Sequence, residues 1–224
     1  MSTSSQLLRL LHLASPALPI GAFHFSQGLE YAVEKGWVDD ESSALTWIEG
    51  IASHGLATLD LPVLARLRRA YGAENFQEAN DWSLRLLAAR ETEEMRAEDR
   101  HMGSALARIL IDLAICSPEV QAEREAVSYP AMFARACAAW AISEIDSLQT
   151  YAWAWAENQT LAAVKLVPLG QSAGQRILHA LIPTLQSLSA RALELSDEDI
   201  GTSTVMQTFA SARHESQYTR LFRS

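Results

Sequence analysis

The chain has 224 residues, of which 49% are hydrophobic and 20% are charged, and its formal net charge at pH 7 is −9. This composition is typical of a soluble globular domain with a substantial core. The acidic balance argues against nucleic acid or an anionic membrane as the main partner. The two cysteines, Cys116 and Cys137, are too far apart for a CxxC motif, and we expect reduced, packed thiols in a cytoplasmic protein.

No targeting or membrane segment is predicted. Residues 1–6 carry no basic side chain and Arg9 interrupts the leucine run that follows, so the N-terminus lacks the pattern of a signal peptide. Arg108, Asp112 and Arg135 fall inside the most apolar stretches. No stretch therefore reaches the ~18 uncharged apolar residues that a membrane-spanning helix needs.

The first predicted elements are two short helices joined by a loop. A leucine-rich run predicts a helix over residues 7–12, which the following proline would end. Residues 14–25 contain prolines and a glycine and are predicted to form a loop that exposes Phe23 and Phe25. Ser26 is the expected N-cap of the second helix.

Helical spacing of apolar residues continues through the middle of the chain. Asp39 or Asp40 is expected to cap the next helix, and Asp60, followed closely by a proline, predicts the start of another. Residues 75–115 keep a helical pattern, in which we expect a break or kink near Gly103.

The second half of the chain is also predicted to be helical. Ser128 is expected to open an alanine-rich helix, another helix follows it, and residues 171–192 form a third in which Pro183 is expected to introduce a kink. No alternating strand pattern persists anywhere in the sequence. We therefore predict an all-α fold, with one globular, multi-helix, bundle-like domain over residues 1–224 and a docking tail at about 211–224.

The segment 213–224 concentrates three arginines and two aromatic residues in an acidic protein. Arginine and aromatic side chains anchor protein interfaces because they combine a large contact area with directional bonding. This composition is typical of a docking peptide. It fits equally well a final helical turn that packs Leu221 and Phe222 on the protein's own core.

The sequence contains none of the common catalytic motifs. A glycine-rich nucleotide loop (GxxxxGK[ST] or GxGxxG) and a GxSxG motif are both absent, so we predict no catalytic residue. The six histidines form no HxxxH pair, and Glu98 with His101 is a single copy of a spacing that di-iron bundles use twice. We therefore predict that residues 90–100 form a solvated charged face and that the chain has no stable metal site.

Lys165 is one of only two lysines, and it interrupts the apolar run 161–167. A charge among apolar neighbours must find a partner, reach solvent or lose its proton. This chemistry alone favours a lysine with a buried stem and an ammonium group that reaches water.

Three separated motifs, at residues 18–30, 164–171 and 213–224, resemble in order the signature of the UreF family of urease accessory proteins. Together they span nearly the whole chain. The differences are small: Phe25 stands where the family often has tyrosine, and Thr219 where it often has serine.

The resemblance implies a helical, non-enzymatic factor that takes part in nickel-urease maturation. UreF-like proteins form a homodimer that associates with a protein called UreD or UreH, and this pair recruits the GTPase UreG for nickel delivery to apo-urease. No cofactor is expected to be bound stably, because the assembled complex handles the nickel. One alternative is a helical protein that carries nickel directly through His24 or His101, and another is a regulator of an unrelated GTPase.

The resemblance also implies which residues bind partners. These are Ser26, Gln27, Glu30, Lys165, Arg213, His214, Glu215, Tyr218, Arg220, Leu221, Phe222 and Arg223. We expect the first four to face UreG, where they would hold it or gate its GTP hydrolysis. We expect Arg220, Leu221, Phe222 and Arg223 to anchor the tail on UreD or UreH.

Overall fold

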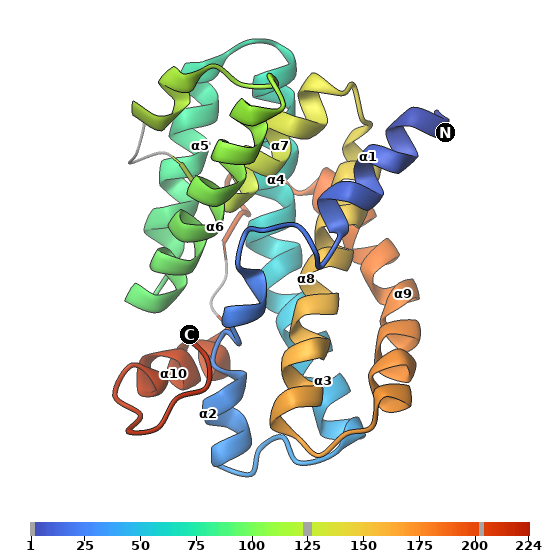
Figure 1. Ribbon diagram of the computed structural model, residues 1–224, viewed down its shortest axis with the longest axis vertical. Coiled ribbons are helices and arrows are strands. Elements are labelled where there is room, and N and C mark those ends of the chain that lie inside the picture. The colour runs from blue at the N-terminus through green and yellow to red at the C-terminus, as the bar shows by residue number, and fades with distance from the viewer. Residues whose placement is uncertain (1–2, 123–126, 202–203) are drawn as a thin grey trace.

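Two long helices, α8 (Glu144–Leu166) and α9 (Gln171–Glu194), pack side by side along one side of the molecule (Figure 1). The structure is a computed structural model that describes residues 3–122, 127–201 and 204–224. Within these ranges it contains helices, turns and irregular segments but no strand. The all-α prediction is therefore confirmed.

The other elements complete one compact helical domain around these two helices. In chain order they are α1 (Ser4–Ala14), η1 (Ala22–His24), α2 (Leu29–Glu34), α3 (Glu41–Ile51), η2 (Ala52–Asp60), α4 (Leu61–Gly72), α5 (Phe76–Ala89), α6 (Glu93–Asp112), η3 (Pro118–Ala122), α7 (Tyr129–Ala139) and α10 (Val205–His214). η1 and η3 are 3-10 helices, and η2 is a π-helix.

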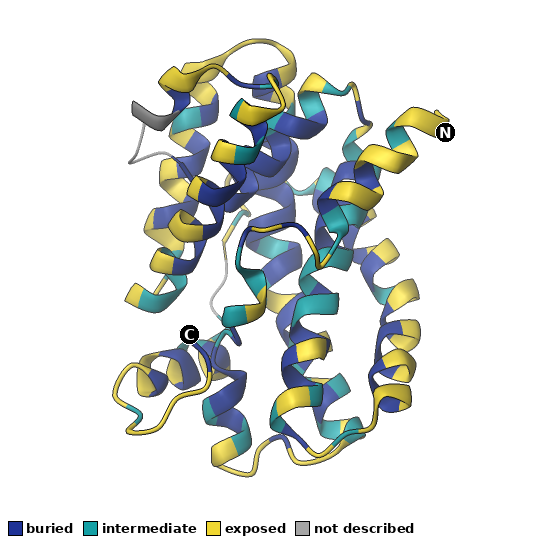
Figure 2. Cartoon of the chain, in the orientation of Figure 1, coloured by how far each residue is buried: buried dark blue, intermediate teal, exposed yellow. Residues whose placement is uncertain are grey.

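Helix α4 forms the centre of the core and is buried along most of its length (Figure 2). It packs against α5, α7, α8 and α9. Leu61, Leu64 and Leu67 of α4 are completely buried, as is Phe133 of α7. Because burying one such side chain contributes about 1.5–3 kcal/mol, these contacts fix the helices that surround α4.

Side-chain caps define several of the helix starts. Thr3 and Asp40 each form a capping box, at the starts of α1 and α3, and Ser128 accepts a hydrogen bond at the start of α7. The predicted caps at Asp40 and Ser128 are confirmed. The helix α9 continues without interruption through Pro183.

The helix predicted to have Ser26 as its N-cap starts two residues later than expected, at Leu29, with Gly28 as its N-cap. Gln27 (φ 53°) and Gly28 (φ 85°) have left-handed backbone conformations, which cannot begin an α-helix. Gly28 also lies against α10, where an added Cβ would be 2.9 Å from the backbone nitrogen of Ser211. The prediction of Ser26 as the N-cap was wrong, although its hydroxyl still accepts a hydrogen bond from the backbone N–H of Glu30 (3.3 Å).

Of two further predicted helix boundaries, one is present and one is absent. Helix α4 starts directly after Asp60, as predicted, but Asp60 has α-helical dihedral angles and its side chain makes no capping hydrogen bond, because the chain passes continuously from η2 into α4. Helix α6 runs straight through Gly103, where an added Cβ would be 2.5 Å from the carbonyl carbon of Ser128. Glycine at this position allows α6 to pack closely against the start of α7, and it does not interrupt α6. The chain breaks earlier, before α6, which Thr92 caps.

The loop predicted after α1 is present and includes η1. Phe23 is exposed as expected, but Phe25 is only 4% exposed, so its predicted exposure was wrong. Cys116 and Cys137 are both free and buried, and burial raises the pKa of the Cys137 thiol to about 12. Among the described residues, no helix combines the length and apolarity needed to cross a membrane.

Candidate partner-docking site

The C-terminal tail folds back onto the N-terminal motif. After α10 the chain forms a loop that returns toward the residues before α2 (Figure 1). The backbone N–H of Arg223 donates to the carbonyl of His24 (2.7 Å), and both the backbone N–H and the hydroxyl of Ser26 donate to the main-chain oxygen of Ser224. Phe222 and Ser224 are buried. The tail therefore packs Phe222 on its own chain, as in the second of the two alternatives that the sequence left open, but it does so without a helical turn, and Leu221 stays exposed.

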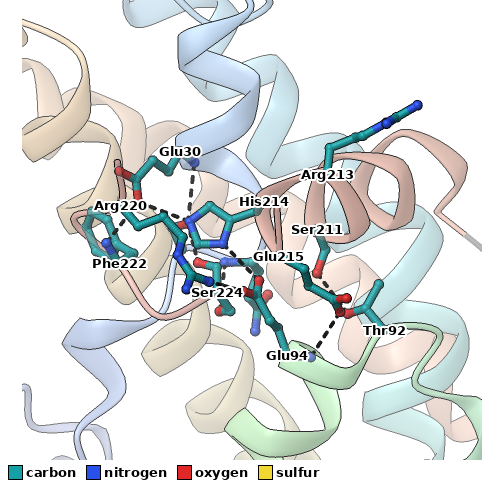
Figure 3. Close-up of polar contacts among 12 residues, drawn as sticks. Glu30, Thr92, Glu94, Ser211, Arg213, His214, Glu215, Arg220, Phe222 and Ser224 are labelled. Atoms are coloured by element: carbon teal, nitrogen blue, oxygen red, sulfur yellow. Dashed lines mark hydrogen bonds and ion pairs between the residues drawn. The ribbon is translucent and has the colours of Figure 1, made fainter. Parts of the chain in front are cut away.

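The carboxylate of Glu30, on α2, holds the tail in place (Figure 3). One oxygen accepts a hydrogen bond from the backbone N–H of Leu221 (2.7 Å). The other accepts from the backbone N–H of Phe222 (2.8 Å) and lies 3.1 Å from Nε2 of His214. Hydrogen bonds to a charged acceptor contribute about 1.5–3 kcal/mol each. We call Glu30, Glu94, His214 and residues 220–224 the tail clamp.

His214 is completely buried between two carboxylates of the tail clamp (Figure 3). Its Nδ1 lies 2.8 Å from Glu94 on α6, and its Nε2 faces Glu30 on α2. Arg220 donates to the other oxygen of Glu94 at 2.9 Å. Burial by itself lowers the pKa of His214, but the hydrogen bonds to Glu94 and Glu30 outweigh it and raise that pKa above 6.5. The protonated ring can donate to both carboxylates at once.

A further buried carboxylate, Glu98, holds the end of the tail. It accepts hydrogen bonds from the hydroxyl of Ser224 (3.1 Å) and from the side-chain amide of Gln27 (2.8 Å). The oxygen of Gln27 in turn accepts from the indole N–H of Trp155 (2.9 Å). Burial raises the pKa of Glu98 to about 7, despite these hydrogen bonds, which lower it. Gln27 therefore links the tail to α6 and α8.

Lys165 covers the tail clamp from the side of α8. Its ammonium group lies 5.7 Å from the ring centre of Phe23 and 5.6 Å from that of Phe222. Cation–π contacts of this kind contribute about 0.5–1 kcal/mol at exposed sites. Lys165 is exposed, in agreement with the prediction that its charge reaches water. It connects the second motif of the sequence to the first and the third.

The remaining predicted tail residues lie toward the outer surface. Tyr218 is fully exposed and Leu221 is 68% exposed. The guanidinium of Arg213 lies over the ring of Phe209 at 5.3 Å, and Arg223 is exposed. Another protein could cover these side chains without breaking many of the contacts that they make within this chain.

Glu215 and Ser211 attach α10 to the start of α6. Glu215 accepts a hydrogen bond from the backbone N–H of Glu93 (3.1 Å), and the hydroxyl groups of Ser211 and Thr92 lie 2.8 Å apart (Figure 3). A carboxylate at a helix N-terminus is stabilised by the helix dipole. With these contacts, all the partner-binding residues predicted from the sequence lie in or beside the tail clamp.

Residues 90–100 form the solvated face predicted from the sequence only in part, since Glu91, Glu93 and Arg100 are exposed but other charged side chains are not. Glu98 and Asp99 are buried, and the side chain of Arg90 is 11% exposed. Arg90 donates to Asp99 at 2.6 Å and to both oxygens of Asp60. Burial would lower the pKa of Arg90, but the charges of Asp60 and Asp99 raise it well above the usual value.

This buried ion cluster was missed because helical spacing reveals only neighbours on the same helix. Asp60 precedes Arg90 by 30 residues, and nothing in the sequence pairs them. The one available signal was a run of acidic residues that includes arginines at a helix start. A partly open cavity of about 70 Å³ lies beside the cluster and is also lined by Gln27 and Tyr151.

The described residues contain no group of three or more His, Cys, Asp or Glu side chains placed to hold a metal ion. His24 and His101 approach a common point, since a Cβ added to Gly21 would lie 3.6 Å from the former's Nδ1 and 3.2 Å from the latter's Nε2. Two imidazoles are fewer ligands than stable sites for first-row metals require. Nothing in this geometry favours the direct nickel carrier over the accessory factor.

Comparison with known proteins identifies the family. The UreF family model matches residues 38–182. The chain belongs to the UreF family. The urease accessory protein UreF of Hahella chejuensis is 46% identical over 218 residues, which cover 97% of this chain and 98% of that protein. The UreF proteins of Alkalilimnicola ehrlichii and Teredinibacter turnerae are 45% and 43% identical, over 96% and 99% of this chain and 95% and 100% of theirs.

The family model and the full-length relatives cover different parts of the candidate site. The model of the UreF family ends before the tail and begins after the motif at residues 18–30. The UreF relatives align over nearly the whole chain, so their similarity is not limited to the central helices. The resemblance stated from the three sequence motifs is therefore confirmed. These relatives are named as urease accessory proteins rather than as enzymes.

Proposed function

We propose that this chain is a non-catalytic maturation factor for urease. Its membership in the UreF family and the name of its relatives support this role. As a cytoplasmic homodimer it associates with UreD or UreH, recruits the GTPase UreG and supports GTP-dependent insertion of nickel into apo-urease. Nickel is the cargo of the assembled complex, not a cofactor of this chain. Neither nucleic acid nor a membrane is among the proposed partners.

The observation that best supports docking through the tail is its ordered position. The tail clamp fixes the backbone of residues 220–224, while Tyr218 and Leu221 point their apolar surface into solvent. A loop ordered before binding loses less conformational entropy when a partner arrives. Aromatic and arginine side chains are also the ones that anchor interfaces. The tail is therefore the proposed binding surface for UreD or UreH.

Lys165 is the proposed contact for UreG. Its ammonium group is exposed beside Phe23, whereas both oxygens of Glu30 are occupied by the tail. Glu30 therefore influences partner binding by positioning the tail. Ser26 and Gln27 have the same positioning role, because their side chains bond to the main-chain oxygen of Ser224 and to Glu98.

Coexpression with UreD or UreH, followed by affinity purification, tests the tail surface. The double variant Tyr218→Ala, Leu221→Ser removes exposed apolar area and leaves the tail clamp in place, because Leu221 bonds to Glu30 through its backbone. We expect UreD or UreH to be lost while the unfolding temperature stays unchanged. The matched control is Leu7→Ser, Leu8→Ser, at exposed positions of α1. Undiminished recovery of UreD or UreH with the tail variant contradicts the proposal.

A parallel experiment tests the UreG contact. Lys165→Ala is expected to reduce the recovery of UreG and leave UreD or UreH bound, and Lys35→Ala, at the chain's other lysine, is the control. Measuring GTP turnover by UreG with and without the chain separates activation from gating. Faster turnover indicates an activator. Flat turnover, together with failed urease activation in Glu30→Ala, indicates a checkpoint.

A further inference from the structure

An apolar groove of about 770 Å³ lies between residues 37–54 and the start of α10. Trp37, Trp47 and Ile51 line it, together with Val205 and Met206 of α10. Val205 is 71% exposed and Met206 is 52% exposed. Clustered exposed side chains of this size mark interaction surfaces more often than isolated ones do. We call this surface the α3–α10 groove.

The charged side chains along the α3–α10 groove are acidic. Asp39 and Asp40 line it and are exposed, and no lysine or arginine is among the described residues that do so. Hydrogen bonds from Ser43 lower the pKa of Asp40, so this carboxylate stays charged at neutral pH. The groove therefore attracts a basic occupant and repels an anionic membrane surface.

We propose that the α3–α10 groove binds a helical segment of a partner protein that carries large apolar side chains and at least one lysine or arginine. A helix fits because helices bound the groove, and the described residues offer no strand edge to which an extended peptide could add. The apolar side chains pack against Trp37, Val205 and Met206, and the basic side chain pairs with Asp39 or Asp40.

Helix α1 of the same chain cannot be this occupant. It exposes Leu7, Leu8 and Leu11, but it packs on α8 at the opposite end of the molecule from α3 and α10 (Figure 1). Tyr218 and Leu221 of the tail are not among the described residues that line the α3–α10 groove, so variants can change the two surfaces independently.

The test measures binding of two short, fluorescently labelled helical peptides to the full chain by anisotropy. Both have leucines at helical spacing, and their polar positions are all lysine in one and all glutamate in the other. We expect the lysine peptide to bind at least ~10-fold more tightly. Val205→Ser, Met206→Ser should weaken it by ~10-fold or more, because central apolar anchors dominate such interfaces. The matched control, Leu7→Ser, Leu8→Ser, should leave the affinity unchanged.

The charge requirement has its own variant. Asp39→Asn, Asp40→Asn should reduce the preference for the lysine peptide to less than ~3-fold while the fold is kept, because asparagine is as good an N-cap as aspartate. The tail variant Tyr218→Ala, Leu221→Ser should bind the lysine peptide normally. Recovery of UreD or UreH therefore tests the tail surface, and binding of the lysine peptide tests the α3–α10 groove, so that each proposal can fail without the other.

Three results would overturn the proposal. The two peptides binding equally well would remove the role of Asp39 and Asp40. An equal loss of binding in the α1 control would show that the peptide binds nonspecifically to exposed apolar side chains. Concentration-dependent dimerisation that Val205→Ser, Met206→Ser abolishes would assign the α3–α10 groove to a second copy of this chain instead.

Discussion

Replacing Glu30 by alanine is expected to release the tail without unfolding the domain. The carboxylate accepts hydrogen bonds from the backbone N–H groups of Leu221 and Phe222 and faces Nε2 of His214. All three donors are part of the tail clamp, and Glu30 is their common acceptor. The helical core around α4 makes none of these contacts, so its unfolding temperature should change little.

The size of the effect follows from these three contacts. A hydrogen bond to a charged group contributes about 1.5–3 kcal/mol. The three share one carboxylate, so their contributions are coupled and do not simply add. We expect the free energy of local tail opening to fall by about 3 kcal/mol, which corresponds to a roughly hundredfold larger open population at ~1.4 kcal/mol per factor of ten.

Hydrogen exchange measures this opening directly, at the amides of Leu221 and Phe222. In Glu30→Ala these amides should exchange roughly a hundredfold faster, whereas amides of α4 should be unaffected. Glu34→Ala is the matched control, because Glu34 lies on the same helix and, among the residues that the structure describes, its side chain pairs only with the exposed Lys35. Unchanged exchange at both tail amides in Glu30→Ala would refute the assignment of Glu30 as the residue that holds the tail.

Three further predictions concern stability. Glu98 and His214 both have a higher pKa in the folded chain than in the unfolded chain, where the pKa values are 4.5 and 6.5. The stability that each group contributes is complete at pH values below its unfolded pKa. It is lost as pH rises through its folded pKa, which is about 7 for Glu98. Urea unfolding should therefore show stability falling toward alkaline pH, less steeply in Glu98→Gln; parallel profiles would contradict this. Arg90→Ala leaves two buried carboxylates unpaired and should lower the free energy of unfolding by about 3–5 kcal/mol, and an unshifted urea midpoint would count against the buried ion cluster. Gly103→Ala should destabilise the chain by about 1–3 kcal/mol despite its better helix propensity, and a higher melting temperature would disprove the close approach of α6 and α7.

The sequence was sufficient to predict the fold class and most of the helices. Apolar spacing and side-chain caps are local signals, and Asp40 and Ser128 do cap the helices that they were expected to cap. The composition of the tail also drew attention to the segment that proved central to the candidate site. What composition could not decide was whether Phe222 faces its own core or a partner, because that depends on a pocket built by other segments.

Three of the sequence-based errors arise where distant segments meet. Ser26 looks like an N-cap, but the left-handed Gln27 and Gly28 that delay the helix are set by contact with α10. Gly103 was expected to break the helix, but it lies in close contact with Ser128. Arg90 was expected to be solvated, but its side chain forms an ion pair with Asp60. In each case the deciding neighbour lies at least 20 residues away, beyond the range of helical periodicity.

The bond between Ser26 and Ser224 joins residues that are 198 positions apart. Contacts of such long sequence separation form late, because the intervening chain must already be arranged. While a ribosome is still adding α10, Glu30 and Glu94 have neither His214 nor the tail amides as partners. The tail clamp is therefore assembled only after residues 214–224 have been synthesised, and until then this end of the molecule lacks the surface that the tail forms.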